Sequence, residues 1–203
     1  MNTWVPWIEI VPYDQSHGKL RMLYDRVTGP GNNVDNIMLV HSLRPHSMEG
    51  HMALYKSVLH HTGNTLPKWL LELVGVYVSL LNRCAYCVEH HYGGLKRLLN
   101  DDGRAAALRA TLESDDLGGL DPREQAMLAY ARALTLTPAE TTAGHVHAMR
   151  GAGLSDGEIL EVNQVTAYFA YANRTVLGLG VTTDGDILGL SPNSGDGDDW
   201  THR

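Results

Sequence analysis

Apolar residues recur along most of the chain at the three- and four-residue spacing of amphipathic helices, and no segment alternates convincingly as a strand. This pattern predicts an all-α protein. Turn-forming Gly, Pro and Asn residues separate most of the apolar segments. The predicted helices cover residues 17–27, 36–41, 48–61, 67–81, 84–100, 104–112, 121–134, 137–150 and 155–177. We therefore expect a multi-helix bundle in residues 17–183.

Two of these helices begin with strong local signals. Asp121 precedes Pro122, which places a capping side chain before a proline at the first helical position. Ser155 is followed three residues later by Glu158, the spacing of a capping box. The starts of these two helices are therefore predicted from side-chain chemistry as well as from periodicity.

The predicted helix 67–81 is apolar on nearly all sides. Such a helix is buried inside a domain or a subunit interface. Residues 1–16 contain Trp4 and Trp7 and resemble an extended arm with little core of its own. From these two segments we expect a homo-oligomer.

Two further features concern the organisation of the chain. Residues 72–83 and 161–174 both form an apolar helical stretch that ends in Asn-Arg, which suggests a duplicated helical unit. Residues 184–203 are rich in Gly and Asp and predict a loose acidic C-terminal tail.

The composition argues against several classes of partner. Sixteen Lys and Arg against 23 Asp and Glu give a net charge of -7, so a surface that binds nucleic-acid phosphates is not expected. No apolar run approaches the ~18 residues that a membrane span needs. The N-terminus lacks the basic and apolar regions of a signal peptide. We expect a soluble cytoplasmic protein with no nucleic-acid or membrane partner.

The two cysteines of the chain, Cys84 and Cys87, form a CxxC motif. This spacing occurs in redox-active dithiols and in one half of many zinc sites, and two ordinary buried cysteines are a third interpretation. A zinc site would need further ligands. The candidates are His90, His91, His145 and His147.

Helical geometry favours the redox interpretation. Cys84 follows the Asn-Arg break and lies near a helix start, where unpaired N–H groups stabilise a thiolate. Cys84, Cys87 and His91 share one helix face, and His91 lies one turn beyond Cys87, where it can exchange a proton with the sulfur. His90 points about 100° away from His91 and is not expected to take part.

Glu72 is the acidic residue of the otherwise apolar helix 67–81. A buried carboxylate needs a partner, and a carboxylate that is hydrogen-bonded to an imidazole forms a proton relay. Two partners are open at this point. One is His91, and the other is an ion pair with Arg83.

The arrangement Glu72-x₁₁-Cys84-x₂-Cys87-x₃-His91 resembles the signature of the AhpD-like alkylhydroperoxidases, within the carboxymuconolactone decarboxylase family, and in particular its peroxidase-related branch. The similarity extends over roughly residues 15 to 182. It implies an AhpD-like helical fold that assembles as a dimer, trimer or hexamer. It also implies a thiol peroxidase that acts on hydroperoxides, uses no cofactor or metal, and is regenerated by an external dithiol reductant.

Carried over residue by residue, the resemblance implies that Cys87 is the peroxidatic cysteine and Cys84 the resolving one. His91 and Glu72 correspond to the proton relay. One position departs from the family pattern, because Tyr86 stands where the founding alkylhydroperoxidase has a histidine. A tyrosine hydroxyl, with an ordinary pKa of about 10, cannot shuttle protons near neutrality as an imidazole does.

Two alternatives to the peroxidase remain at this point. The first is a lactone decarboxylase or isomerase of the wider family, which would need acid–base groups and no cysteine pair. The second is a non-catalytic helical oligomer whose cysteines bind zinc or sense oxidants.

Overall fold

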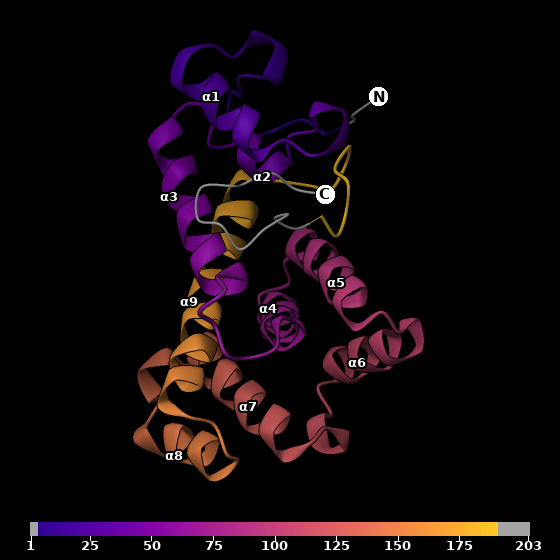
Figure 1. Ribbon diagram of the computed structural model, residues 1–203, viewed down its shortest axis with the longest axis vertical. Coiled ribbons are helices and arrows are strands. Elements are labelled where there is room, and N and C mark those ends of the chain that lie inside the picture. The colour runs from indigo at the N-terminus through magenta and orange to yellow at the C-terminus, as the bar shows by residue number, and fades with distance from the viewer. Residues whose placement is uncertain (1–3, 191–203) are drawn as a thin grey trace.

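The computed structural model describes residues 4–190, and every regular element in this range is helical, as predicted (Figure 1). The α-helices are α1 (Gly18–Val27), α2 (Asn36–Leu39), α3 (Pro45–Tyr55), α4 (Lys68–Leu81), α5 (Ala85–Leu99), α6 (Asp102–Ser114), α7 (Pro122–Leu136), α8 (Ala143–Gly151) and α9 (Asp156–Leu179). Short 3₁₀ turns lie at Tyr13–Gln15, Pro30–Asn32, Leu117–Gly119 and Pro138–Glu140, and a π-helical turn, Lys56–His60, extends α3.

The apolar helix α4 lies at the centre of the fold. It packs against α5, α6, α7 and α9, and Figure 1 shows it almost end-on among them. Every residue of α4 from Leu70 to Ser79 is buried. This burial is completed within one chain, so α4 gives no separate reason to expect a partner subunit. The homo-oligomer stays a prediction.

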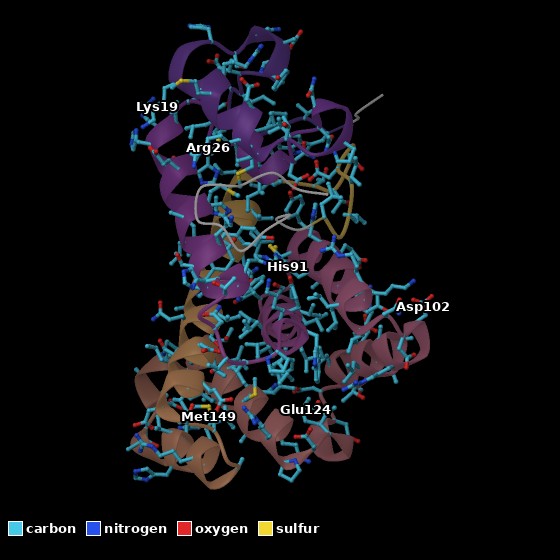
Figure 2. The ribbon with its side chains drawn as sticks, viewed as in Figure 1. Lys19, Arg26, His91, Asp102, Glu124 and Met149 are labelled. Atoms are coloured by element: carbon cyan, nitrogen blue, oxygen red, sulfur yellow. The ribbon has the colours of Figure 1, made fainter. Side chains whose placement is uncertain are left out.

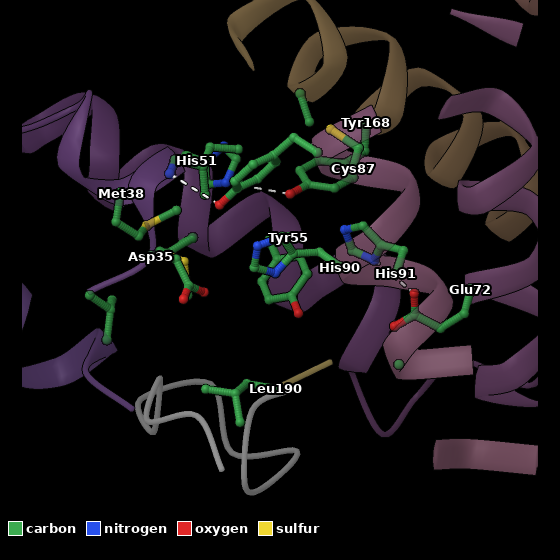
Figure 3. A pocket seen from close by; sticks show the side chains of 16 residues that line it. Asp35, Met38, His51, Tyr55, Glu72, Cys87, His90, His91, Tyr168 and Leu190 are labelled. Carbon is green, nitrogen blue, oxygen red and sulfur yellow. Dashed lines mark hydrogen bonds and ion pairs between the residues drawn. The ribbon is translucent and has the colours of Figure 1, made fainter. Parts of the chain in front are cut away.

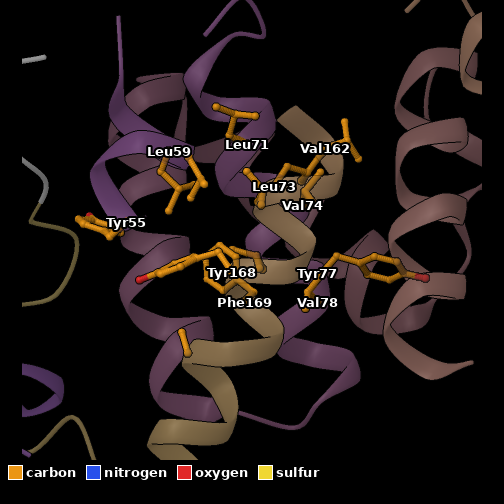
Figure 4. Packing of buried hydrophobic residues seen from close by; sticks show 14 of the residues in the cluster. Tyr55, Leu59, Leu71, Leu73, Val74, Tyr77, Val78, Val162, Tyr168 and Phe169 are labelled. Atoms are coloured by element: carbon orange, nitrogen blue, oxygen red, sulfur yellow. The ribbon is translucent and has the colours of Figure 1, made fainter. Parts of the chain in front are cut away.

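Helix α9 is pressed closely against α4 in the core (Figure 4). A Cβ atom at Gly75 would lie 2.2 Å from Cε2 of Phe169, so this contact requires a glycine on α4. Phe169 is itself fully buried, and Figure 4 shows it beside Tyr168. The close packing of the two helices therefore determines which side chains of α9 lie next to the C-terminal end of α4.

The two predicted helix starts are confirmed. The side chain of Asp121 accepts hydrogen bonds from the backbone N–H groups of Arg123 and Glu124, and Ser155 forms a capping box with Glu158. The prediction of one helix over residues 137–150 is wrong at its start. Thr142 adopts an extended conformation and caps α8, which begins only at Ala143, because a threonine hydroxyl competes with the helical hydrogen bonds.

The N-terminal arm folds back on its own chain. Trp4 is buried, and its Nε1 atom donates a hydrogen bond to the carbonyl oxygen of Gly180 over 2.8 Å. It belongs to a small apolar cluster, separate from the main core, that contains both cysteines. The members of this cluster are Trp4, Val40, Cys84, Tyr86, Cys87, Val176 and Val181. The arm therefore covers the cysteine end of α5.

Within residues 4–190, no helix is both long enough and apolar enough to cross a membrane.

Candidate active site

The two cysteines lie at the tight turn between α4 and α5. Arg83 takes a left-handed backbone conformation with φ of 57°, which redirects the chain after α4. Cys84 then occupies the N-cap of α5, and Cys87 lies in the first turn of that helix. Both side chains are buried, and their Sγ atoms are 2.8 Å apart. The prediction that Cys84 lies at a helix start is confirmed.

The two thiols differ in acidity. The hydrogen bond from the Cys87 thiol lowers the pKa of Cys84, and the backbone N–H of Cys87 lowers it further, although burial opposes both. Burial raises the pKa of Cys87 well above its ordinary value, and the neighbouring Cys84 sulfur adds to the rise. The first proton that the reduced pair loses is therefore that of Cys84.

Asn173 supports this turn from the neighbouring helix α9. It is fully buried, its Nδ2 atom donates to Oγ of Ser79 over 3.0 Å, and its Oδ1 atom accepts from Nδ2 of Asn82 over 2.9 Å. A hydrogen bond between the Asn173 side chain and Cys87 lowers the pKa of that thiol, against the larger effect of burial. Sequence analysis missed Asn173. The available signal was a polar residue within an apolar helix.

Glu72 and His91 form the predicted pair. The Nδ1 atom of His91 on α5 lies 2.7 Å from Oε2 of Glu72 on α4, and Glu72 is only 3% exposed. The observed partner of Glu72 is therefore His91 rather than Arg83. The imidazole also packs edge-on against Phe169, with ring centroids 4.5 Å apart. A Cβ atom at Gly94 would lie 3.1 Å from Oε1 of Glu72, so the carboxylate fits closely over that glycine.

Cys87, His91 and Glu72 line one cavity near the middle of the molecule, between α3 and α5 (Figures 2 and 3). The space within the cavity and in the solvent at its open mouth comes to about 660 Å³. Cys84 lies behind Cys87 and lines a different hollow, beside the end of α9. Most of the remaining wall is apolar or phenolic, and consists of Val27, Ile37, Met38, Met52, Tyr55, Tyr86, Tyr168, Ala172 and Leu190.

Asp186 organises a second polar group at this cavity. Its buried carboxylate accepts hydrogen bonds from the backbone N–H of Asn36, at 3.0 Å, and from the hydroxyl of Tyr86, at 2.8 Å. It also lies 3.1 Å from Nε2 of His90, whose ring packs on that of Tyr86. Tyr86, the position that departs from the family pattern, thus anchors Asp186. His90 lines the same cavity as His91; that it takes no part in the chemistry stays a prediction.

Asp186 and Leu190 fall in the segment that the sequence predicted to be a loose tail. In residues 184–190 this prediction is wrong, because the buried Asp186 carboxylate ties the segment to α5 and to the start of α2. No sequence signal distinguished this aspartate from its neighbours in the Gly- and Asp-rich stretch. Residues 191–203 lie outside the described residues.

Two further titratable side chains line the cavity. Burial raises the pKa of Asp35 to about 6; the charge of His90 opposes this shift and that of Asp186 adds to it. His51 is 4% exposed, and burial, together with the charges of His41 and His91, lowers its pKa to about 3. Its Nε2 atom lies 3.4 Å from the hydroxyl of Tyr168. Sequence analysis named neither Asp35 nor His51 as a site residue.

In the part of the chain that the structure describes, no group of three or more His, Cys, Asp and Glu side chains is placed to hold a metal ion. His145, one of the zinc candidates, accepts a hydrogen bond from the backbone N–H of Thr142 over 3.2 Å and so helps to cap α8.

Comparison with known families identifies the motif region. Residues 45–118, which extend from the start of α3 to the turn after α6, match the model of the carboxymuconolactone decarboxylase family. They include Glu72, Cys84, Cys87 and His91. The chain is therefore similar to the carboxymuconolactone decarboxylase family in the region that holds the motif. Among curated proteins, none matches the chain.

Solved structures share the fold over nearly the whole chain. The AhpD core of an uncharacterized peroxidase-related protein from Ralstonia eutropha JMP134 superposes with a TM-score of 0.74 and 22% identity, and the match covers 89% of this chain and 93% of that one. An uncharacterized peroxidase-related protein from Silicibacter sp. TM1040 gives 0.69 and 22%, with 87% and 88% covered. The debrominase Bmp8 in complex with 2,3,4-tribromopyrrole gives 0.65 and 19%, with 91% and 94% covered. The chain therefore has the all-α AhpD-like fold.

Proposed function

We propose that this protein is a thiol peroxidase that reduces hydroperoxides through Cys87 and Cys84. One observation carries the proposal. The Cys87 sulfur lies in the wall of a cavity, 2.8 Å from the sulfur of Cys84, and the same wall holds the His91–Glu72 pair. This grouping supports the proposal, because peroxide reduction by a dithiol needs a nucleophile, a resolving thiol and a proton relay.

In the first step the Cys87 thiolate attacks the terminal oxygen of the hydroperoxide. An S–O bond forms, the O–O bond breaks, and the alkoxide leaves with the electron pair. His91 donates a proton to this oxygen, so the products are the Cys87 sulfenic acid and an alcohol. Glu72 holds the imidazole and stabilises its protonated form.

In the second step the sulfur of Cys84 attacks the sulfur of the Cys87 sulfenic acid. The S–O bond breaks, and the hydroxide that leaves takes the proton of the Cys84 thiol to form water, so a Cys84–Cys87 disulfide results. An external dithiol then reduces the disulfide by two exchange steps and is itself oxidised to a disulfide. The proposed partners are thus a hydroperoxide and a dithiol reductant, in an oligomeric cytoplasmic protein.

In this proposal the roles of the two sulfurs depend on which of them a peroxide in the cavity can reach. Cys84 loses its proton first, which by itself would favour Cys84 as the nucleophile. Cys87, however, is the sulfur that lines the cavity with His91. Because the two sulfurs are in contact, the Cys87 proton can pass to the Cys84 thiolate, which leaves the thiolate on the side that a peroxide reaches.

Stopped-flow mixing of the reduced protein with hydrogen peroxide and with cumene hydroperoxide tests this proposal. Free thiols should fall from two to zero per chain, with no covalent dimer. Retention of both thiols under excess peroxide would overturn it. Light scattering on the same sample tests the assembly, because a mass of about 22 kDa would contradict an oligomer.

A second candidate is an acid–base reaction, such as decarboxylation or isomerisation of a lactone. The observation in its favour is that the cavity holds Asp35 as well as the His91–Glu72 pair. The debrominase shows that this fold carries more than one chemistry. Turnover of a lactone by the Cys87→Ser protein would favour this candidate over the peroxidase.

A further inference from the structure

The charge of the active-site cavity points to the class of substrate that it accepts. Glu72 and Asp35 line the cavity, and the Asp186 carboxylate is bonded to two further lining side chains, those of Tyr86 and His90. Among the described residues, no lysine or arginine lines it. Two carboxyl groups therefore line a region that holds no permanent cation, and a third is bonded to side chains of its wall.

The imidazoles of the cavity do not cancel this charge. His91 is bonded to Glu72 and His90 to Asp186, so each can offset one carboxylate at most. His51 is buried and remains neutral, because its pKa is lowered to about 3. Even if His90 and His91 both carry a positive charge, the negative charge of Asp35 remains uncompensated above about pH 6.

Asp35 also has unused capacity to accept hydrogen bonds. The bond that the structure gives it, from Nδ2 of Asn33, is long at 3.4 Å. An ionised carboxylate accepts several hydrogen bonds, so a ligand with an N–H or O–H group can satisfy it. In Figure 3, Asp35 lies on the opposite side of the cavity from Glu72 and the His91 ring.

A second polar atom of the cavity is unpaired. Nδ1 of His51 is buried and has no hydrogen-bond partner within residues 4–190, although His51 lines the cavity. A buried polar atom without a partner is costly. The neutral His51 ring adds no charge to the cavity. Around these two groups the wall is formed mostly by phenol rings and aliphatic side chains, which suit a compact apolar skeleton.

We infer that the cavity selects uncharged hydroperoxides with a compact aromatic or branched skeleton and an amide or hydroxyl group that donates to Asp35, and that it rejects carboxylates. The inference rests on the proposed function for its reaction and on the cavity alone for its selectivity. The hydroperoxide group lies at Cys87 and the donor group at Asp35. A carboxylate at that position meets a like charge in a partly water-excluded space, which costs roughly tenfold or more in binding.

Two hydroperoxides with the same skeleton test the selectivity, because one has N–H donors and no charge, and the other has a charge and no donor. The 4-carboxamide and the 4-carboxylate of cumene hydroperoxide have the same skeleton, and at pH 8 only the carboxylate is charged. Stopped-flow measurement of thiol loss from the reduced protein should give a rate constant at least about tenfold larger for the amide. Equal rates, or a faster carboxylate, would overturn the inference.

Asp35→Asn identifies the residue responsible. In this variant the rate constant for the amide should exceed that for the carboxylate by about threefold at most, since the substitution removes the uncompensated charge. Asp102→Asn is the matched control, because Asp102 is exposed at the edge of the fold, and it should leave the ratio unchanged. A ratio that is the same in the Asp35→Asn protein and in the wild type would refute the role of Asp35.

The matching tertiary alcohols separate this inference from the proposed function, because they bind without oxidising a thiol. Titration calorimetry with the 4-carboxamide and 4-carboxylate of cumyl alcohol should show at least tenfold tighter binding of the amide, and Asp35→Asn should narrow the difference. If the protein binds the amide alcohol more tightly than the carboxylate alcohol but neither hydroperoxide oxidises its thiols, the proposed peroxidase function is refuted and the selectivity stands. If neither alcohol binds at millimolar concentration, or both bind equally, the inferred selectivity is refuted.

Discussion

Nδ1 of His91 lies 2.7 Å from Oε2 of Glu72, so the buried carboxylate on α4 fixes the orientation of an imidazole on α5. With Glu72 as the acceptor, the proton of the neutral ring lies on Nδ1. Nε2 is then the nitrogen that is left to take a proton from a thiol or to return it to a leaving oxygen. In the proposed mechanism the pair therefore defines the direction of proton transfer as well as the presence of a base.

This orientation predicts different effects for the two partners. His91→Ala should lower the rate constant of thiol oxidation by roughly 10²- to 10⁴-fold, because it removes the general acid–base group. Glu72→Gln should have a smaller effect, since the imidazole remains but its orientation and charge stabilisation weaken. Stopped-flow kinetics of the two variants measure both effects. His147→Ala, at an exposed histidine on α8, is the control and should match the wild type.

Gly94 gives a second test of the relay, because no chemical group is removed. In Gly94→Ala the added methyl carbon would lie 3.1 Å from Oε1 of Glu72, so the carboxylate must shift. We expect a several-fold lower rate of thiol oxidation, with the Cys84–Cys87 disulfide still able to form. Gly50→Ala is the matched control, because this glycine lies in α3 with open space around it. A helix is stabilised by about 0.5–1 kcal/mol when such an exposed glycine becomes alanine.

Most of the fold could be predicted from the sequence because it is determined locally. The spacing of apolar residues defined the helices, and Asp121 and Ser155 determined two of their starts. The Cys84, Cys87 and His91 positions follow from helical periodicity within one element, α5. Glu72 could be added because a carboxylate in an apolar helix needs a partner.

The missed residues reach the site through tertiary packing instead. Asp186 comes from a Gly-rich stretch with no periodicity, and it reaches the side chains of the cavity wall because the segment after α9 folds back over α5. Asp35 and His51 come from the first quarter of the chain, and nothing in the CxxC region specifies their distance from it. His90 lies in the wall of the cavity and is bonded to Asp186, which its angle on α5 alone did not indicate.

The roles of the two cysteines are testable through their pKa values. Cys84→Ser removes the thiol that ionises first, so the pKa of Cys87 should fall relative to the reduced wild type, in which the Cys84 sulfur raises it. The variant should consume one equivalent of peroxide and stop at a sulfenic acid, which dimedone traps. The pH dependence of iodoacetamide alkylation measures the pKa. Cys87→Ser should react far more slowly with peroxide; a sulfenic acid on Cys84 at the wild-type rate would reverse the two roles.

The raised pKa of Asp35 predicts that the free energy of unfolding depends on pH in an unusual way. Its pKa of about 6 in the folded protein exceeds the ordinary value of 3.8, mainly because burial disfavours the charged form. Between these two values the folded state binds more protons than the unfolded state, so the free energy of unfolding falls as pH rises through this window. A shift of about two pKa units corresponds to a loss of up to about 3 kcal/mol at neutral pH. Asp35→Asn removes this titration, so the variant should be more stable than the wild type at pH 8 and about equal to it near pH 4.

Urea unfolding of both proteins between pH 4 and pH 8 measures this difference, because the other titrating groups cancel in the comparison. The difference should grow through the window between pH 4 and 6 and then level off. Asp102→Asn, on the exposed edge of α6, should show a small difference that changes little with pH. A flat difference for Asp35→Asn would mean that His90, which faces Asp35 and opposes the shift, compensates its charge fully. A rising difference would establish that this protein keeps an ionised carboxylate in its cavity at a cost in stability, as is expected of a group that serves binding rather than folding.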